Sequence, residues 1–309
     1  MDKRHVISVR SGLLALILLL GAGSVCGVSA EEARILIVGD SWATGILVFK
    51  AFPNVFDEHG LENVGVVGAA TALGGSRAEQ WANNHKGKLD ALDKALAENP
   101  TIDIVHLSIG GNDFLKAAMK DNEDVCRQPP EKRKAVWQRI WKDIETLVQH
   151  ILAQRDNVKV LLNDYDYLDP ALMRKTFGLP LPEELGHAQM NEVLVEFAKF
   201  KRDKAATIAR CGYIQHFGLL HYYYGFPPHF DKHTTRLPGG PPEYDPFAGG
   251  NPAFPNSPEA MPDGVHPMPK GYQYIIDRCY TTFYERWLNP EAPGEEVPVE
   301  AGDVVEAVR

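Results

Sequence analysis

The chain has 309 residues, 44% of them hydrophobic, which is enough to bury the core of one large domain. Its 41 acidic residues outnumber the 32 basic ones and give a formal net charge of -9. Because binding to nucleic acid or to an anionic membrane surface needs clustered Lys and Arg, this charge disfavours both as the main partner.

The first thirty residues have the pattern of a secretory signal peptide. Basic residues at positions 3, 4 and 10 precede an apolar run over 13–20, and Val28-Ser29-Ala30 follows as a cleavage signal. The run is shorter than the roughly 20 apolar residues of a membrane-spanning helix. We therefore expect a signal peptide over residues 1–30, cleavage after Ala30, a secreted or periplasmic protein, and no stable membrane insertion of the mature chain.

Short apolar runs alternate with longer amphipathic segments over most of the remaining chain. The runs predict strands over residues 34–38, 64–67, 102–109, 158–162 and 212–217. Helical spacing predicts helices over 78–97, 131–154, 183–209 and 268–287. This alternation indicates a central parallel sheet with helices on both faces, a three-layer α/β/α domain over residues 31–289. Ligands of such sheets bind beyond the carboxyl ends of the strands, so functional residues should follow the strands.

Two segments depart from this alternation. Residues 219–262 are rich in Pro, Gly and aromatic residues, and we expect an insertion loop there without secondary structure of its own. Its aromatic side chains could line an acyl or aryl pocket, stack on sugars, or pack as a rigid cover. Residues 290–309 are acidic and short of large apolar groups, which predicts a flexible tail.

Cysteines and histidines give no clear metal site. Export permits one disulfide, but the odd number of mature cysteines leaves the pairing open. These cysteines are Cys126, Cys211 and Cys279. Four histidines fall in or near the 219–262 loop: His216, His221, His229 and His233. Two prolines at 227–228 disfavour the helix that would align the last two on one metal ion, so we expect no metal and no cofactor.

Four short segments carry residues suited to ester chemistry. Gly39-Asp40-Ser41 follows the first predicted strand. A serine at a strand-to-helix turn can expose its hydroxyl and direct its backbone N–H at a developing oxyanion. The alternative is that Asp40 or Ser41 simply caps the helix.

Two further segments offer hydrogen-bond donors. Gly75 lies in the turn Leu73-Gly74-Gly75-Ser76-Arg77 after the second predicted strand, and glycine lets a backbone N–H approach a substrate closely. Asn112 lies in Gly110-Gly111-Asn112-Asp113 after the third, and its amide carries two donors. The simpler interpretations are an ordinary turn and a helix cap by Asn112 or Asp113.

The fourth segment, Asp263-Gly264-Val265-His266-Pro267, precedes the last predicted helix. On a turn, this spacing lets Asp263 accept a hydrogen bond from one imidazole nitrogen of His266 and leaves the other facing a nucleophile. A structural Asp–His pair is the alternative. The joint occurrence of a nucleophile, donors and a base near one sheet edge favours catalysis.

Together these segments resemble the four blocks of the SGNH, or GDSL-type, hydrolase family, in the family's order Ser, Gly, Asn, His. The resemblance implies a flavodoxin-like α/β/α fold and hydrolysis of carboxylic esters or thioesters. It implies Ser41 as nucleophile, with His266 and Asp263 as the base and its orienting group. The Ser41 N–H, the Gly75 N–H and the Asn112 side chain correspond to the oxyanion hole, and Trp42 replaces a more usual leucine.

We therefore expect an esterase that needs no cofactor and acts on small or short-chain acyl esters through an acyl-enzyme on Ser41. Two alternatives stay open. A polysaccharide acetyl-ester hydrolase or O-acetyltransferase would use the same three residues, and a non-catalytic glycan-binding module would keep only the scaffold. The oligomeric state is open as well.

Overall fold

A computed structural model describes residues 33–61, 63–225, 237 and 247–289. The signal peptide expected over 1–30 and the tail expected over 290–309 lie outside the described residues, so both stay predictions. Within the described ranges, every helix is too short or too polar to cross a lipid bilayer.

Five parallel strands form one central sheet in the order β2-β1-β3-β4-β5. They are β1 (Ala33–Gly39), β2 (Gly65–Val67), β3 (Ile104–Ser108), β4 (Lys159–Asn163) and β5 (Cys211–Ile214). All residues of β3 are buried, as expected for a parallel strand covered on both faces. The strand order is that of flavodoxin-like folds, so the predicted fold class is confirmed. In this order the chain reverses direction across the sheet between β1 and β3, where such folds bind their ligands.

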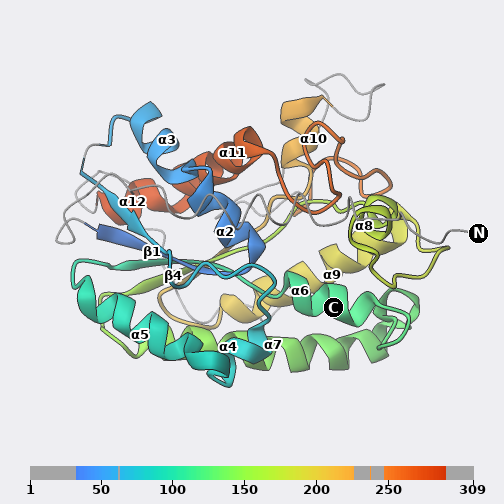
Figure 1. Ribbon diagram of the computed structural model, residues 1–309, viewed down its shortest axis with the longest axis horizontal. Coiled ribbons are helices and arrows are strands. Elements are labelled where there is room, and N and C mark those ends of the chain that lie inside the picture. Colours follow the sequence, from blue (N-terminus) through green and yellow to red (C-terminus); the bar gives the residue numbers. More distant parts are fainter. Residues whose placement is uncertain (1–32, 62, 226–236, 238–246, 290–309) are drawn as a thin grey trace, which may run out of the picture.

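Helices cover both faces of the sheet and complete three layers (Figure 1). One layer contains α2 (Ser41–Val48), α3 (Ala51–Glu58), α11 (Pro269–Cys279) and α12 (Glu285–Leu288). The other contains α4 (Ala78–Ala82), α5 (Lys88–Glu98), α6 (Gly111–Ala118), α7 (Pro130–Leu152) and α9 (His187–Ala205). Two short helices, α8 (Pro170–Phe177) and α10 (Leu219–Tyr224), lie at one end of the molecule, and single 3₁₀ turns occur at His85–Gly87 and Val125–Arg127.

The longest helix, α7, shows why these segments are helical. Pro130 occupies its first turn, where the fixed φ of proline suits the helix and the missing N–H costs nothing. Buried side chains then recur every three or four positions, at Trp137, Ile140, Trp141, Ile144, Leu147, Val148, Ile151 and Leu152. Each large apolar side chain removed from water contributes roughly 1.5–3 kcal/mol, so this stripe holds α7 against the sheet.

The continuous helix predicted over 78–97 is wrong. The segment forms α4 and α5, separated by a turn in which Asn84 and Lys86 have positive φ angles of 49° and 56°. Asn84 Oδ1 accepts a hydrogen bond of 2.8 Å from the backbone N–H of Leu89, which satisfies a donor in the first turn of α5. This side-chain capping replaces the backbone hydrogen bonds that a continuous helix would need.

The helix predicted over 268–287 is present from Pro269 to Leu288 with one π-helical turn inside it, whereas the predicted loop needs correction. A π-helical turn, Tyr280–Tyr284, separates α11 from α12. The 219–262 segment begins with α10, because the buried carboxylate of Asp166 accepts hydrogen bonds from the N–H groups of Gly218 and Leu220 at 2.8 and 2.9 Å. Residues 226–236 and 238–246, which include much of the predicted aromatic loop, lie outside the described residues.

The disulfide that the sequence permits does not form. Cys126, Cys211 and Cys279 are free thiols. Burial raises the pKa of Cys126 and Cys211 to about 12, and it also raises that of Cys279. All three therefore stay protonated near neutral pH and pack as small apolar groups.

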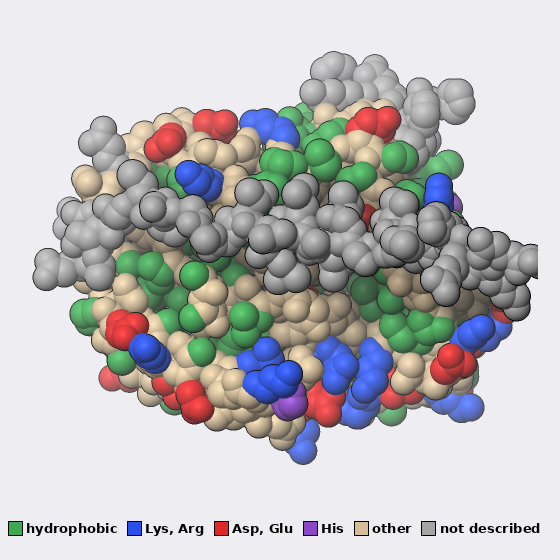
Figure 2. All heavy atoms as spheres, viewed as in Figure 1, with side chains coloured by type: hydrophobic (Ala, Val, Ile, Leu, Met, Phe, Trp, Pro, Cys, Tyr) green, Lys and Arg blue, Asp and Glu red, His purple; other side chains and the backbone are tan. Residues whose placement is uncertain are grey.

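Charged side chains of both signs share the surface. On the face shown in Figure 2, Lys and Arg side chains along the lower helices stand beside Asp and Glu side chains. Ion pairs such as Arg133–Glu196 on α7 and α9 contribute to this mixture.

Candidate active site

The end of β1 and the end of β3 approach each other closely, and this contact sets the position of Ser41. Gly39 pairs with Ser108 in the sheet register and has a φ of 136°. A Cβ at position 39 would lie 1.9 Å from the carbonyl oxygen of Ser108, so only glycine fits. The chain then turns directly into α2, where the next residues carry the functional groups.

Asp40 caps α2 and leaves the Ser41 hydroxyl available. Asp40 Oδ1 accepts a hydrogen bond of 3.0 Å from the N–H of Trp42. Ser41 is the first residue of the helix, and N–H groups in a first helical turn have no intrahelical partner. The capping alternative therefore holds for Asp40, whereas the Ser41 Oγ lies 2.8 Å from His266 Nε2.

The Asp263–His266 turn presents an oriented imidazole to Ser41. His266 Nδ1 lies 2.7 Å from Asp263 Oδ2, and the other carboxylate oxygen accepts from the N–H groups of Val265 and His266 at 2.9 and 2.8 Å. Burial alone would raise the pKa of Asp263, but the hydrogen bond and charge of His266, together with these N–H groups, lower it below its usual value. An ionised carboxylate thus fixes the ring and leaves Nε2 facing the serine.

Asn112 lies beside Ser41 and holds the turn that contains Gly75. Its Nδ2 donates to the carbonyl oxygen of Ser76 at 3.2 Å, and its side chain lines the same pocket as Ser41. Gly75 precedes Ser76 on an exposed turn with a φ of 73°. The structure therefore connects the second and third motifs. It places Asn112 in the pocket wall, whereas Gly75 is not among the residues that line this pocket.

Asp113 and Ser76 act structurally around this turn. Asp113 Oδ2 accepts from the N–H of Ala78 at 2.9 Å, so it caps the start of α4 rather than its own helix. Burial raises the pKa of Asp113. Ser76 Oγ donates to the carbonyl oxygen of Gly39 at 2.9 Å, which ties the same turn to β1.

Tyr165, which the motifs do not include, is a further residue of the site. Its hydroxyl donates to Asp40 Oδ2 at 2.6 Å and accepts from the Gly111 N–H at 2.8 Å. Burial raises the pKa of Asp40 to about 6 although the hydrogen bonds from Tyr165 and Trp42 oppose the rise. Tyr165 comes two residues after β4, so the rule that site residues follow strands would have found it.

A pocket of about 310 Å³ adjoins Ser41 and Asn112. Besides these two residues it is lined by Asp40, Gly111 and seven mostly apolar side chains: Trp42, Phe114, Leu115, Tyr165, Leu168, Leu194 and Val265.

Two described histidines in or near the 219–262 segment, His216 and His221, make their hydrogen bonds away from this site. His216 Nε2 lies 2.7 Å from Asn163 Oδ1, and His221 Nε2 lies 2.9 Å from the carbonyl oxygen of Pro255. Burial lowers the pKa of both, that of His221 to about 4. His229 and His233 lie outside the described residues. In the part of the chain that the structure describes, His, Cys, Asp and Glu side chains form no group of three or more suited to a metal ion.

Comparison with known proteins identifies one matching family. The model of the GDSL-like lipase/acylhydrolase family matches residues 37–274, a span that contains all four motifs. A search of curated proteins finds no match.

Solved structures with distant similarity cover most of the chain. A putative acylhydrolase from Bacteroides fragilis is 14% identical over 89% of this chain and 94% of its own, with a TM-score of 0.46. The acetyl xylan esterase AlAXEase is 15% identical over 81% and 99%, with a TM-score of 0.47. The psychrotrophic esterase EstA from Pseudoalteromonas sp., in a structure inhibited by monoethylphosphonate, is 16% identical over 84% and 99%, with a TM-score of 0.43.

Proposed function

Because this chain belongs to the GDSL-like lipase/acylhydrolase family of carboxylic ester hydrolases, we propose that it cleaves small acyl esters through an acyl-enzyme on Ser41. One observation carries the proposal. Ser41 Oγ, His266 and Asp263 form a continuous hydrogen-bonded chain, with heavy-atom distances of 2.8 and 2.7 Å. Distances in this range are those that proton transfer from a nucleophile to a general base requires.

In the first step His266 Nε2 takes the proton of the Ser41 hydroxyl while Oγ attacks the acyl carbon of the ester. The imidazole becomes positively charged as it gains this proton. Asp263 stabilises that charge across the 2.7 Å hydrogen bond to Nδ1, and its lowered pKa keeps it ionised through the neutral range. The alcohol then leaves with the proton from His266, and water repeats the sequence on the acyl-enzyme, releasing the acid.

The negative charge that develops on the carbonyl oxygen needs hydrogen-bond donors. The Ser41 N–H at the start of α2 and the Asn112 amide at the pocket wall supply two of them, and the Gly75 N–H is the third candidate. Removing one such donor typically slows an acyl-transfer enzyme by about 10²–10³-fold, because the donors are already oriented before the charge forms.

The pocket supports an ester with a small apolar acyl group. Four leucine and phenylalanine side chains from α6, α9 and the segment after β4 form its wall next to Ser41. An acyl chain buried there gains about 0.8 kcal/mol for each CH₂ removed from water. A sugar hydroxyl in the same place would lose its hydrogen bonds to water. We therefore assign the pocket to the acyl group and leave the alcohol at the open side, where different alcohols can be accommodated.

Hydrolysis of p-nitrophenyl esters from acetate to octanoate tests this function. We expect the wild-type protein to prefer the shorter esters and Ser41→Ala to show no hydrolysis above the uncatalysed rate. Leu115→Ala enlarges the pocket and should shift the preference towards longer chains. Leu47→Ala, on α2 and outside the pocket lining, is the matched control and should leave it unchanged. Equal rates for wild type and Ser41→Ala with every ester would contradict the proposal.

A further inference from the structure

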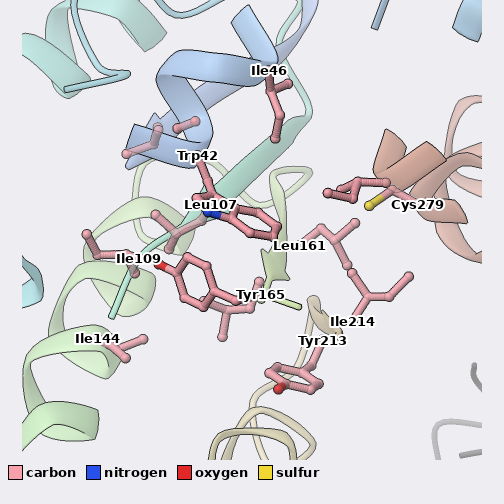
Figure 3. Close-up of a cluster of buried hydrophobic side chains, with 14 of the residues drawn as sticks. Trp42, Ile46, Leu107, Ile109, Ile144, Leu161, Tyr165, Tyr213, Ile214 and Cys279 are labelled. Carbon is pink, nitrogen blue, oxygen red and sulfur yellow. The ribbon is translucent and has the colours of Figure 1, made fainter. Parts of the chain in front are cut away.

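Two buried aromatic side chains, Trp42 and Tyr165, line the pocket beside Ser41. Trp42 is 1% exposed and Tyr165 is 4% exposed. Their rings meet edge to face, with centroids 5.1 Å apart and an interplanar angle of 78° (Figure 3). Because both line the pocket, they stand between the hydrophobic core and the reacting groups.

Tyr165 connects the segment that carries Ser41 with the segment that carries Asn112. Its hydroxyl hydrogen goes to the Asp40 carboxylate, and its oxygen accepts the Gly111 N–H. The approach to Gly111 is close, because a Cβ there would lie 2.5 Å from the Tyr165 ring. Glycine at position 111 is thus required by the tyrosine, and the next residue, Asn112, takes its position from this contact.

Trp42 connects the segment that carries His266 with α2. Its indole Nε1–H donates to the carbonyl oxygen of Val265 at 2.8 Å. Val265 directly precedes His266, and its side chain lines the pocket next to Trp42. A leucine or phenylalanine at position 42 could occupy part of the same space but could not donate this hydrogen bond.

We propose that Trp42 and Tyr165 form one positioning unit for ester hydrolysis, in which Trp42 places the base His266 and Tyr165 places the oxyanion donor Asn112. The inference rests on the proposed function of Ser41. Each hydrogen bond joins a rigid aromatic ring to the backbone or carboxylate of a catalytic segment, so small displacements of either ring move a reacting group. A displacement of about 1 Å in such a site can cost about 10²-fold in rate.

The variants that test this proposal are Tyr165→Phe and Trp42→Phe, each made alone and in combination with Asn112→Ala. Tyr165→Phe should lower kcat about tenfold with little change in KM, and this loss should largely disappear when Asn112 is already absent, because both changes then affect the same donor. Trp42→Phe should lower kcat about tenfold in both backgrounds, because it acts through His266. Active sites are titrated with a fluorophosphonate and kcat is calculated per titrated site, so that unfolded protein does not lower the measured kcat.

Two controls separate positioning from ordinary core packing. Tyr213 is a buried tyrosine whose hydroxyl also donates to a carboxylate, that of Asp164. Trp137 is a buried tryptophan whose indole N–H donates to Glu196 at 3.0 Å. Neither lines the pocket. Tyr213→Phe and Trp137→Phe should lower the thermal midpoint as the test variants do, with kcat per active site unchanged.

Should Tyr165→Phe fail to fold, Asp40→Asn removes the charged acceptor of the same hydrogen bond and should show the same dependence on Asn112. The proposal is overturned if the kcat of Tyr165→Phe and Trp42→Phe stays within twofold of wild type. It is also overturned if Tyr165→Phe costs the same factor with and without Asn112. A Ser41→Ala protein as active as wild type would instead remove the proposed function itself.

Discussion

Two histidine–aspartate pairs of nearly equal geometry lie in different regions of the molecule. His266 Nδ1 is 2.7 Å from Asp263 Oδ2, and His59 Nε2, at the end of α3, is 2.7 Å from Asp277 Oδ1 on α11. Both imidazole side chains are 30% exposed. The distance and the exposure of the imidazole therefore do not distinguish them, although the carboxylate of Asp263 is 14% exposed and that of Asp277 is 35% exposed.

The surroundings of the two pairs differ. The second nitrogen of His266 faces the Ser41 hydroxyl at the edge of a pocket, whereas the ring of His59 lies against Tyr280, with centroids 4.1 Å apart. The carboxylate of Asp263 is also held by two backbone N–H groups of its own turn. A carboxylate beside an imidazole can serve catalysis where the other imidazole nitrogen faces a nucleophile. Matched substitutions in the two pairs can therefore test whether this difference in surroundings decides the role of each histidine.

The largest expected effect comes from removing the base. His266→Ala should lower kcat/KM by about 10⁴-fold or more, because Ser41 then has no group to accept its proton. His59→Ala should stay within twofold of wild type. Steady-state hydrolysis of p-nitrophenyl acetate, with circular dichroism to verify folding, measures both, and a similar loss in the two variants would remove the distinction between the pairs.

Replacing the carboxylate of each pair by an amide should give the next largest difference in kcat between the two pairs. Asp263→Asn keeps the shape of the turn but no longer stabilises the imidazolium or fixes its tautomer, so kcat should fall by about 10³–10⁴-fold. Asp277→Asn is the matched control on α11 and should leave kcat unchanged. Steady-state kinetics of the two variants gives both kcat values. An Asp263→Asn enzyme with wild-type kcat would show that the Asp263 carboxylate plays no part in the reaction.

Removing the candidate oxyanion donor Asn112 should have a smaller effect. Asn112→Ala is expected to lower kcat by about 10²–10³-fold with a modest change in KM, because the amide acts on the charge that forms in the transition state. Asn83→Ala serves as the control, since Asn83 is exposed and its side-chain amide donates to the carbonyl oxygen of Glu79 on the same helix. A change confined to KM would indicate a binding role for Asn112 instead.

The buried carboxylate of Asp40 should leave a signature in the pH dependence of stability. Its pKa is about 6 in the folded protein and 3.8 without burial. Between these values the folded state holds a proton that the unfolded state has released, so the contribution of Asp40 to stability falls as the pH rises from about 4 to about 6. Asn at position 40 cannot titrate. The free energy of unfolding of Asp40→Asn, relative to wild type, should therefore rise by about 3 kcal/mol across this window.

Urea denaturation at pH 4, 5, 6 and 7 measures this difference. Asp203→Asn is the control, because Asp203 is exposed and pairs with Arg202 on the surface. Parallel curves for wild type and Asp40→Asn would show that the buried carboxylate does not carry the proposed proton.

The sequence was sufficient for those parts of the site that follow from strand order. Ser41, Asn112 and the Gly75 turn lie in the segments that follow β1, β3 and β2, and parallel strands bring their carboxyl ends to one edge. Asp263 and His266 are close enough in the chain for one turn to set their geometry. The amino-acid sequence alone is therefore enough to select these residues as candidates.

Contacts between distant side chains could not be predicted in this way. Tyr165 meets Asp40 across 125 positions, and Trp42 meets the Val265 carbonyl across 223. Competition between a polar side chain and the helical backbone for the same N–H group was missed as well. Asn84 accepts the N–H of Leu89 at the start of α5, where the helix predicted over 78–97 divides. Hydrophobic periodicity does not record which polar side chain will satisfy a free backbone group, so such breaks appear only in the folded structure.

Labelling with a fluorophosphonate shows whether Ser41 is an activated nucleophile. The reagent phosphonylates a serine only where a neighbouring base activates its hydroxyl, and digestion followed by mass spectrometry identifies the modified residue. We expect one label per chain, on the peptide that contains Ser41, and no label on Ser41→Ala or His266→Ala, while His59→Ala labels like wild type. Labelling that persists in Ser41→Ala, or a wild-type protein that takes up no label, would contradict this expectation.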